Sequence, residues 1–252
     1  METAKVVIVT GGTYGIGRAI TVTLAERGYR VIAFGLEEKQ PGSTAQMGIE
    51  GTRAELNKRN ADADLLIADV SKGEEVRSVV EFAARKYARI DALVNNAAIR
   101  VHGKVMETSE ETWDRVMAVN LKGTFLATKA VLPYMLAQGK GAIVNISSAS
   151  GWGRPNRVAY CASKSGVFGF SAALASDHLD EHIRVNVVVP GYTLTGMTES
   201  EGGTTAAKNA SGRALVPRDT ANAVAFLLSE EAETISGSVI TVGGPLLSSR
   251  AL

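Results

Sequence analysis

The hydrophobic positions of the chain fall into seven short, nearly continuous runs, separated by longer stretches with helical periodicity. The runs are rich in β-branched residues, as expected for strands of a parallel sheet that is covered on both faces. They lie at residues 5–10, 30–34, 64–67, 91–94, 141–146, 183–189 and 238–242. The helical stretches lie at residues 16–27, 74–87, 112–135, 159–179 and 218–229. This alternation predicts an α/β fold, a doubly wound parallel seven-stranded sheet with helices on both faces.

Two polar stretches interrupt the alternation. Residues 37–60 are rich in Gly, Lys and Glu and are expected to hold one short helix around residues 52–59. Residues 199–211 are small, polar and weakly periodic. Because a helix and a strand still follow them, they predict a mobile substrate loop near residues 193–215 and not a linker between domains. We therefore expect residues 1–252 to form a single domain.

Composition narrows the class of protein. The 252 residues carry 27 basic and 26 acidic side chains and no basic run, so nucleic-acid binding is not expected. No apolar stretch reaches the length of about 18 residues that a membrane span needs, and the N-terminus lacks the pattern of a secretory signal, so we expect a cytoplasmic enzyme. Cys161 is the single cysteine. It leaves no internal disulfide, and although His178 and His182 lie four residues apart, no metal site is expected.

A glycine-rich segment, Gly11-Gly12-Thr13-Tyr14-Gly15-Ile16-Gly17, follows the first predicted strand and opens the first predicted helix. Glycines permit a tight turn and let the backbone approach a pyrophosphate closely. The N-terminus of the helix then offers unpaired N–H groups and the positive end of its dipole to the phosphates. Glycines also form ordinary turns, but the position between strand and helix favours a dinucleotide-binding site.

The spacing Thr10-Gly11…Gly15-Ile16-Gly17 is one of several motifs through which the chain resembles the short-chain dehydrogenase/reductase family. The others are Ala68-Asp69-Val70, Asn95-Asn96-Ala97-Ala98, Asn120, Ser147-Ser148, Tyr160…Lys164 and Pro190-Gly191. Together they extend over nearly the whole length. The resemblance implies a Rossmann-type fold, NAD or NADP as cofactor, and hydride transfer between the nicotinamide and a secondary alcohol or ketone. It also implies a homotetramer that pairs the helices of residues 112–135 and 159–179.

The resemblance further implies which residues contact the cofactor. Asp69 is expected at the adenine ring, and Asn95-Asn96-Ala97-Ala98 is expected to steady the sheet beside the cofactor. Ala98 stands where the family usually has glycine, and its methyl group is expected to crowd the nicotinamide side slightly. The full expected set is Gly11, Thr13, Tyr14, Gly15, Ile16, Gly17, Asp69, Val70, Asn96, Ala97, Ala98, Tyr160, Lys164, Pro190, Gly191, Thr193 and Thr195.

Tyr160 and Lys164 lie four residues apart and therefore on one face of a predicted helix. A phenol with a pKa of about 10 is a poor proton exchanger at neutral pH. A nearby ammonium favours the phenolate and lowers that pKa, so the pair predicts Tyr160 as the general acid/base. The resemblance gives Lys164 a hydrogen bond to the nicotinamide ribose. It also gives Asn120 a bound water that links the lysine to solvent.

Two serines compete for the position beside the reacting oxygen, where a hydroxyl stabilises developing charge. Counting back from Tyr160 by the family's usual spacing selects Ser147. Matching the Ser-x-x-Gly phase, with Gly151 as its glycine, selects Ser148 and requires a loop shorter by one residue. Loops lose residues more readily than strand ends change register, so we choose Ser148.

The choice between NAD and NADP depends on the end of the second predicted strand, where a carboxylate favours NAD and a basic residue favours NADP. Gly35 occupies the expected carboxylate position and Tyr14 the turn position that is often basic. Glu37 is available for a 2′-hydroxyl and Lys39 for a 2′-phosphate. Because no arginine is placed for the phosphate, the sequence favours NAD weakly.

The loop between the serines and Tyr160 is expected to lie near the substrate, together with the segments that follow Ala98 and Gly191. The candidate substrate residues are Arg100, Ser150, Trp152, Arg154, Arg157 and Tyr192. The three arginines either form an anion-binding mouth or lie at the surface or a subunit contact. A polar or anionic substrate is expected, and sugar acids, oxo acids, polyols and dihydrodiol carboxylates remain equally open. The alternative function is a dinucleotide-binding sensor or scaffold without turnover, which the intact set of Asn120, Ser148, Tyr160 and Lys164 does not favour.

Overall fold

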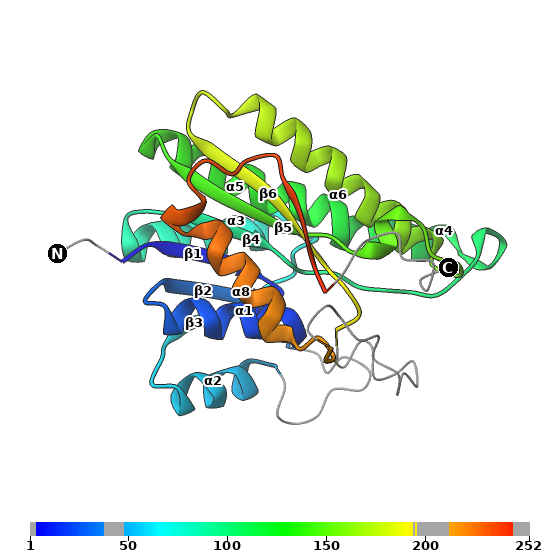
Figure 1. The fold of residues 1–252 in the computed structure, drawn as a ribbon, viewed down its shortest axis with the longest axis horizontal. Coiled ribbons are helices and arrows are strands. Elements are labelled where there is room, and N and C mark those ends of the chain that lie inside the picture. The colour runs from blue at the N-terminus through cyan, green and yellow to red at the C-terminus, as the bar shows by residue number, and fades with distance from the viewer. Residues whose placement is uncertain (1–3, 38–47, 194, 196–211, 244–252) are drawn as a thin grey trace.

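Seven parallel strands form the sheet at the centre of the computed structural model, which describes residues 4–37, 48–193, 195 and 212–243 (Figure 1). Their spatial order is β3-β2-β1-β4-β5-β6-β7. The strands are β1 (Val6–Thr10), β2 (Arg30–Gly35), β3 (Ala63–Ile67), β4 (Ala92–Asn95), β5 (Gly141–Ile146), β6 (Ile183–Pro190) and β7 (Val239–Val242). The predicted α/β fold is confirmed, and every strand begins and ends within about one residue of its predicted bounds.

The strand order reverses at the centre of the sheet. The chain builds β1, β2 and β3 outward in one direction and then crosses to β4, which pairs with the other side of β1. In such a sheet the connections after β1 and β4 leave in opposite directions, and a crevice opens beyond their carboxyl ends. The topology therefore places the glycine-rich segment and the Asn95-Asn96-Ala97-Ala98 segment at one site.

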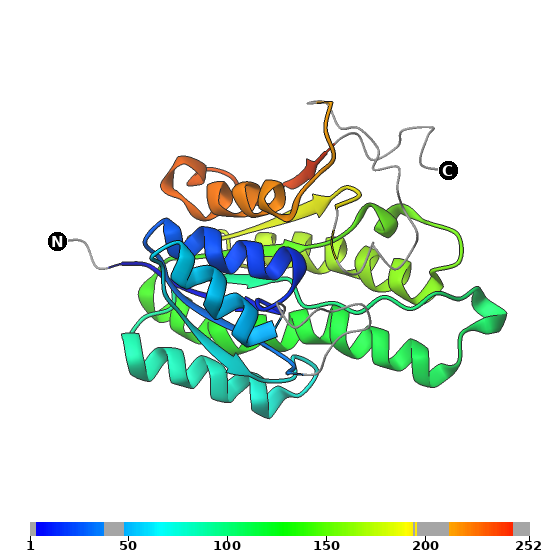
Figure 2. The same cartoon turned by 90° about the horizontal axis from the view of Figure 1, so that it is seen from below.

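Helices cover both faces of the sheet (Figures 1 and 2). The helices are α1 (Gly15–Glu26), α2 (Gly48–Lys58), α3 (Gly73–Tyr87), α4 (Glu110–Met117), α5 (Gly123–Gln138), α6 (Val158–Asp177) and α8 (Pro217–Leu228). One core lies between the sheet and α1 with α8, and the other lies between the sheet and α3, α5 and α6. None of the helices in the described ranges is both long and apolar enough to cross a membrane.

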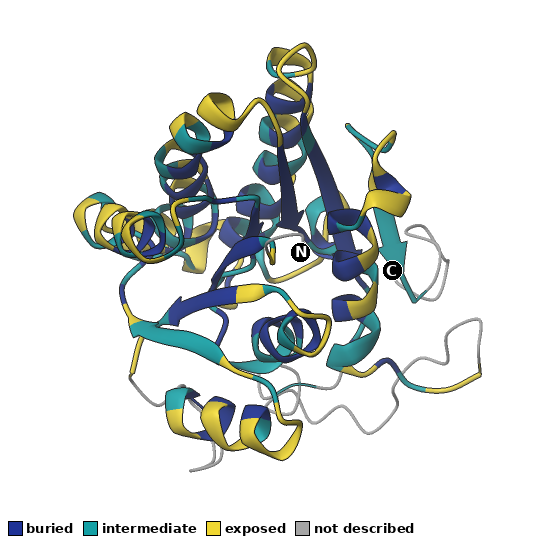
Figure 3. Ribbon diagram, turned by 90° about the vertical axis from the view of Figure 1, so that its left-hand side faces the viewer, coloured by how far each residue is buried: buried dark blue, intermediate teal, exposed yellow. Residues whose placement is uncertain are grey.

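The alternation of side chains along β1 explains why residues 6–9 are all apolar. Val6 and Ile8 belong to the core under α3, α5 and α6, whereas Val7 and Val9 belong to the core under α1 and α8. All five residues of the strand are buried. Figure 3 shows that the inner strands of the sheet are buried like β1, that the edge strands β3 and β7 are less buried, and that exposed residues lie on the outer faces of the helices. A strand with both faces covered needs hydrophobic residues at every position.

The helix predicted at residues 112–135 begins two residues earlier, ends later and is interrupted. It begins at Glu110 because the Ser109 hydroxyl accepts a hydrogen bond from the Thr112 N–H and so caps α4. A π-helical turn, η2 (Ala118–Lys122), then separates α4 from α5. Such turns insert one residue and recur at functional sites. The predicted homotetramer, which uses this helix pair and α6, stays a prediction.

Two connections differ in detail from the sequence pattern. The short helix expected at residues 52–59 begins at Gly48, whose positive φ of 85° suits glycine at the entry. The predicted loop at residues 193–215 lies largely outside the described residues. Its two ends are described, because Thr193 and Leu215 form an isolated parallel bridge. The ends of the loop therefore meet next to β6, at the carboxyl edge of the sheet.

Candidate active site

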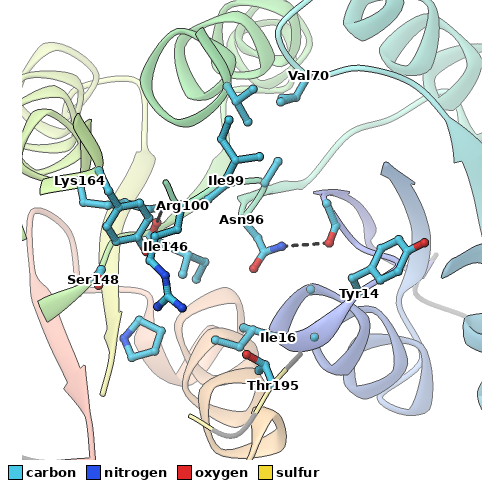
Figure 4. Close-up of a pocket in the computed structure, with 18 of the residues that line it drawn as sticks. Tyr14, Ile16, Val70, Asn96, Ile99, Arg100, Ile146, Ser148, Lys164 and Thr195 are labelled. Atoms are coloured by element: carbon cyan, nitrogen blue, oxygen red, sulfur yellow. Dashed lines mark hydrogen bonds between the residues drawn. The ribbon is translucent and has the colours of Figure 1, made fainter. Parts of the chain in front are cut away.

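A cleft of about 490 Å³ opens at the carboxyl edge of the sheet, a volume within the usual range of small-molecule sites (Figure 4). Its walls come from the glycine-rich segment and from the residues that follow β2, β3, β4, β5 and β6. All of the residues predicted to contact the cofactor line this cleft: Gly11, Thr13, Tyr14, Gly15, Ile16, Gly17, Asp69, Val70, Asn96, Ala97, Ala98, Tyr160, Lys164, Pro190, Gly191, Thr193 and Thr195.

The glycines of the turn are required by close approaches of the backbone. Gly11 has a φ of 61°, and a Cβ atom there would lie 2.8 Å from the Ala97 Cα. A Cβ atom on Gly17 would overlap the Gly11 carbonyl oxygen and the Asn96 amide nitrogen. The first turn of α1 is therefore pressed against the end of β1, which exposes its N–H groups to the cleft.

Asn96 and Thr10 clamp the two central strands together at their carboxyl ends. The backbone N–H groups of Asn96 and Ala97 both donate to the Thr10 hydroxyl at 3.0 Å. The Asn96 side-chain amide donates to the carbonyls of Thr10 and Gly11 at 3.1 and 3.0 Å. Figure 4 shows the Asn96 side chain turned toward the glycine-rich segment. These bonds fix the curvature of the turn that would hold a pyrophosphate.

The end of the cleft near Tyr14 holds the residues predicted for the adenosine half of the cofactor. The Asp69 carboxylate accepts hydrogen bonds from the Ser71 N–H and hydroxyl at 2.9 and 2.7 Å. The Thr13 hydroxyl is fully buried and has no hydrogen-bond partner among the described residues. It faces Gly35, where an added Cβ would lie 3.0 Å from it. A buried hydroxyl without a partner is costly, so this position fits a ligand that supplies one.

Tyr160 and Ser148 meet at the opposite end of the cleft. The Ser148 hydroxyl accepts a hydrogen bond from the Ser150 N–H at 3.1 Å and shares a hydrogen bond with the Tyr160 hydroxyl. Burial raises the pKa of Tyr160, while the hydrogen bond from Ser148 and the charges of Arg100 and Arg157 lower it. The net direction is upward, so in this state the phenol is protonated at neutral pH.

The pKa of Tyr160 is raised in the cofactor-free protein, whereas the sequence pattern predicts that Lys164 lowers it. The Lys164 ammonium donates to the Ile146 carbonyl at 2.8 Å and lies 6.0 Å from the centre of the Tyr160 ring. Burial lowers the pKa of Lys164 itself to about 8. Helical spacing places the two residues on one face but says nothing of their desolvation, which outweighs the lowering causes here. The role of Tyr160 as acid/base with Lys164 beside it stays a prediction.

The lowered pKa of Lys164 predicts a pH dependence of stability. The unfolded lysine titrates at 10.5 and the folded one at about 8, so between these values the unfolded chain binds more protons and stability rises with pH. We expect the unfolding free energy of the cofactor-free protein, relative to Lys164→Met, to rise by about 3 kcal/mol across that range. Urea denaturation of both proteins at the two ends of the range measures it. A difference that stays constant with pH would contradict the buried, weakly basic lysine.

The second serine has a different environment. The Ser147 hydroxyl is buried and donates to the Lys164 carbonyl at 2.8 Å, although the residue also lines the cleft. Its hydroxyl is therefore used to join the end of β5 to α6. Ser148 directs its hydroxyl to Tyr160. This difference between the two hydroxyls supports the choice of Ser148 made from the sequence, and that choice stays a prediction.

Asn120 lies in the π-helical turn and is fully buried. Its side chain accepts from the Ile99 N–H at 2.8 Å and donates to the Ile99 carbonyl at 2.9 Å and to the Ser163 hydroxyl at 3.0 Å. It thus fixes the segment after β4 against α6. Asn120 does not line the cleft, so its predicted role in a proton relay stays a prediction.

Of the predicted substrate residues, Arg100, Ser150, Arg154, Arg157 and Tyr192 line the cleft. Trp152 does not. Its ring packs on Phe168 of α6 with ring centroids 4.3 Å apart, so it fixes the loop after Ser148 from outside. The cleft also includes Arg115 of α4, which sequence reasoning missed. The only sequence signal for Arg115 was its position five residues before Asn120. That it lines the cleft follows from the structure alone.

Among the described residues no group of three or more His, Cys, Asp or Glu side chains is arranged to hold a metal ion. His178 faces Glu181, with 3.8 Å between the imidazole and the carboxylate.

Comparison with known proteins places the chain in a protein family. The family model described as short chain dehydrogenase matches residues 5–205. The 3-oxoacyl-(acyl-carrier-protein) reductase FabG of Thermotoga maritima is 37% identical over 248 residues, covering 96% of this chain and 98% of that protein. The 2-(S)-hydroxypropyl-CoM dehydrogenase 3 of Xanthobacter autotrophicus is 36% identical over 251 residues, covering 95% of each. A variant of actinorhodin polyketide ketoreductase, solved with NADPH, matches with a TM-score of 0.87 at 33% identity and covers 98% of this chain and 99% of that one.

Proposed function

The chain belongs to the short-chain dehydrogenase family and is an oxidoreductase, and we propose that Tyr160 is the acid/base that exchanges a proton with its alcohol or ketone substrate. The observation that carries the proposal is the contact between the Tyr160 phenol and the Ser148 hydroxyl at one end of the cleft. Two oxygens that share a hydrogen bond there can both reach the oxygen of one bound substrate.

The residues of the cleft fit a nicotinamide dinucleotide. The close-packed turn of Gly11 and Gly17, the N-terminus of α1 and the unpartnered Thr13 hydroxyl suit its phosphates and ribose. When bound, the nicotinamide supplies or accepts the hydride of the reaction. The chain's own residues position the substrate and move the proton.

The proton path begins at the Tyr160 oxygen. In ketone reduction the phenol donates its proton to the carbonyl oxygen as that oxygen gains charge, and the Ser148 hydroxyl hydrogen-bonds the same atom. In alcohol oxidation the phenolate takes the hydroxyl proton. Ketone reduction leaves Tyr160 as a phenolate, and the positive charges of Arg100 and Arg157 favour that phenolate.

A screen of alcohols and ketones with NAD and NADP, followed by the absorbance of the reduced nicotinamide, tests this function. Turnover with at least one substrate class, lowered by at least about 10²-fold in Tyr160→Phe, is the expected result. Cofactor binding without turnover over a broad panel would favour the sensor or scaffold alternative.

For the cofactor, we propose that NAD is used at least as well as NADP. Burial and, secondarily, the negative charge of Glu37 raise the pKa of Tyr14, which lines the cleft at the adenosine end. That carboxylate opposes a 2′-phosphate and suits a 2′-hydroxyl. Measuring kcat/KM with both cofactors tests the choice, and Glu37→Gln is expected to lower the preference for NAD several-fold, the scale of one surface charge.

A tenfold advantage for NADP in the wild-type protein would contradict this proposal. It would indicate that a basic group reaches the phosphate, and Lys39, which lies outside the described residues, is the first candidate. Lys39→Gln is then the variant that should remove the NADP advantage.

A further inference from the structure

The end of the cleft near Tyr160 is rich in positive charge. Arg100, Arg154, Arg157 and Lys164 line it, and Arg115 lines the adjoining wall on α4. Among the described residues of the lining, Asp69 is the one carboxylate, and it lies at the adenosine end, where its Oδ1 accepts both hydrogen bonds from Ser71. Figure 4 shows Arg100 on the side of Ser148 and Lys164, across the cleft from Tyr14.

Backbone pairing holds the segments of Arg100 and Arg157 together. The Gly103 N–H donates to the Asn156 carbonyl at 3.0 Å, and the Val158 N–H donates to the Gly103 carbonyl at 3.2 Å. Gly103 and Arg157 thereby form an isolated parallel bridge between the segment after β4 and the start of α6. The bridge thus joins the backbone of Arg157 to the segment that carries Arg100, three residues before Gly103.

The backbone conformations of Asn156 and Gly103 also favour the bridge between the two segments. Asn156 has a φ of 60°, a left-handed conformation that asparagine tolerates better than most residues. A Cβ atom on Gly103 would lie 2.7 Å from the Thr108 hydroxyl, so glycine is needed where the bridge forms. Arg157 then occupies the N-cap of α6, one turn before Tyr160. The backbone position of Arg157 is therefore fixed by these constraints.

We propose that Arg100 and Arg157 form an anion-binding pair that holds a carboxylate of the substrate while its carbonyl or hydroxyl group lies at Tyr160 and Ser148. This rests on the proposed function and names its substrate class, an oxo acid or the corresponding hydroxy acid. A guanidinium binds a carboxylate through two parallel hydrogen bonds, which orients the substrate as well as attracting it. The charges of both arginines also act on the Tyr160 phenol, which shows that they lie within electrostatic range of the reacting oxygen.

The test uses the full-length protein with pyruvate, acetoacetate and levulinate, each paired with its methyl ester. The ester keeps the ketone and removes the negative charge. For the best pair we expect kcat/KM to be at least about tenfold higher for the acid. Arg100→Gln and Arg157→Gln are each expected to remove most of that preference through KM, and Arg157→Lys to retain part of it. Arg77→Gln on the outer face of α3 removes one charge away from the cleft and is expected to change nothing.

Two further measurements separate the possible outcomes. Affinity for the reduced cofactor, followed by its fluorescence, is expected to stay at the wild-type value in both Gln variants. Loss of that affinity would overturn the proposal and assign the arginines to the cofactor phosphates. Equal use of acid and ester by the wild-type protein would also overturn it while leaving the oxidoreductase function intact.

Calorimetric titration of the three acids into the enzyme–cofactor complex tests the anion-binding pair separately from the proposed reaction at Tyr160. Binding that is lost in Arg157→Gln, without turnover of any acid or ester, would support the anion pair and contradict the proposed reaction. No binding and no turnover of the acids, with turnover of a neutral ketone, would contradict the anion pair alone. Thermal melting of each variant shows that the comparison is made between folded proteins.

Discussion

Tyr160→Phe is expected to lower kcat by at least about 10²-fold, the usual scale for the loss of a general acid/base. The substitution removes one oxygen and leaves the ring, which is buried between α6 and the cleft. The Ser148 hydroxyl loses the Tyr160 hydroxyl, its hydrogen-bond partner in the cofactor-free protein. Without the phenol, water would have to replace the proton donor. Steady-state kinetics with saturating cofactor measures the loss.

The affinity for the reduced cofactor should stay near the wild-type value, because Tyr160 is one of many residues that line the cleft. Tyr134→Phe on α5 is the matched control, since it removes the same atom from a partly buried ring outside the cleft. Tyr160 would lose its assigned role if the variant kept more than about a tenth of wild-type turnover. Equal losses in both variants would point to a general effect on stability.

The fold could be predicted from the sequence because its signals are local and repeated. Each strand is a short apolar run, and β1 illustrates why: both of its faces are covered, so no polar residue interrupts it. The glycine-rich segment could be placed for a similar reason, since Gly11 and Gly17 occupy positions that a Cβ atom would block. The apolar strands and the glycine positions could both be predicted because the parallel α/β topology determines which parts of the chain pack against them.

Features that depend on burial and on contacts between distant segments could not be predicted. The spacing of Tyr160 and Lys164 indicated their shared face, but the direction of both pKa shifts follows from desolvation in the folded chain. Trp152 was expected at the substrate, and its contact with Phe168 comes from the fold of the loop onto α6. The bridge between Gly103 and Arg157 likewise joins segments that no periodicity relates.

The Ser148→Ala substitution is expected to lower kcat on the order of 10²-fold, the scale for removal of one hydrogen-bond donor to a developing oxyanion. Ser147→Ala is expected to affect turnover much less. The Ser147 hydroxyl is used in a buried bond to the Lys164 carbonyl, so its loss should lower the unfolding free energy by about 1 kcal/mol. Steady-state kinetics and urea denaturation of both variants under the same conditions measure the two effects.

The double variant with Tyr160→Phe decides whether Ser148 acts through the reacting oxygen. If the serine and the phenol hydrogen-bond one substrate atom, adding Ser148→Ala to Tyr160→Phe should cost far less than it does in the wild-type background. Ser147→Ala should cost about the same in both backgrounds, because its partner is the Lys164 backbone and not the phenol. A larger loss of kcat for Ser147→Ala, together with non-additivity with Tyr160→Phe, would show that counting back from the tyrosine identifies the correct serine. In that case the structural bond from Ser147 to α6 would have to be exchanged for a bond to substrate when the cleft is filled.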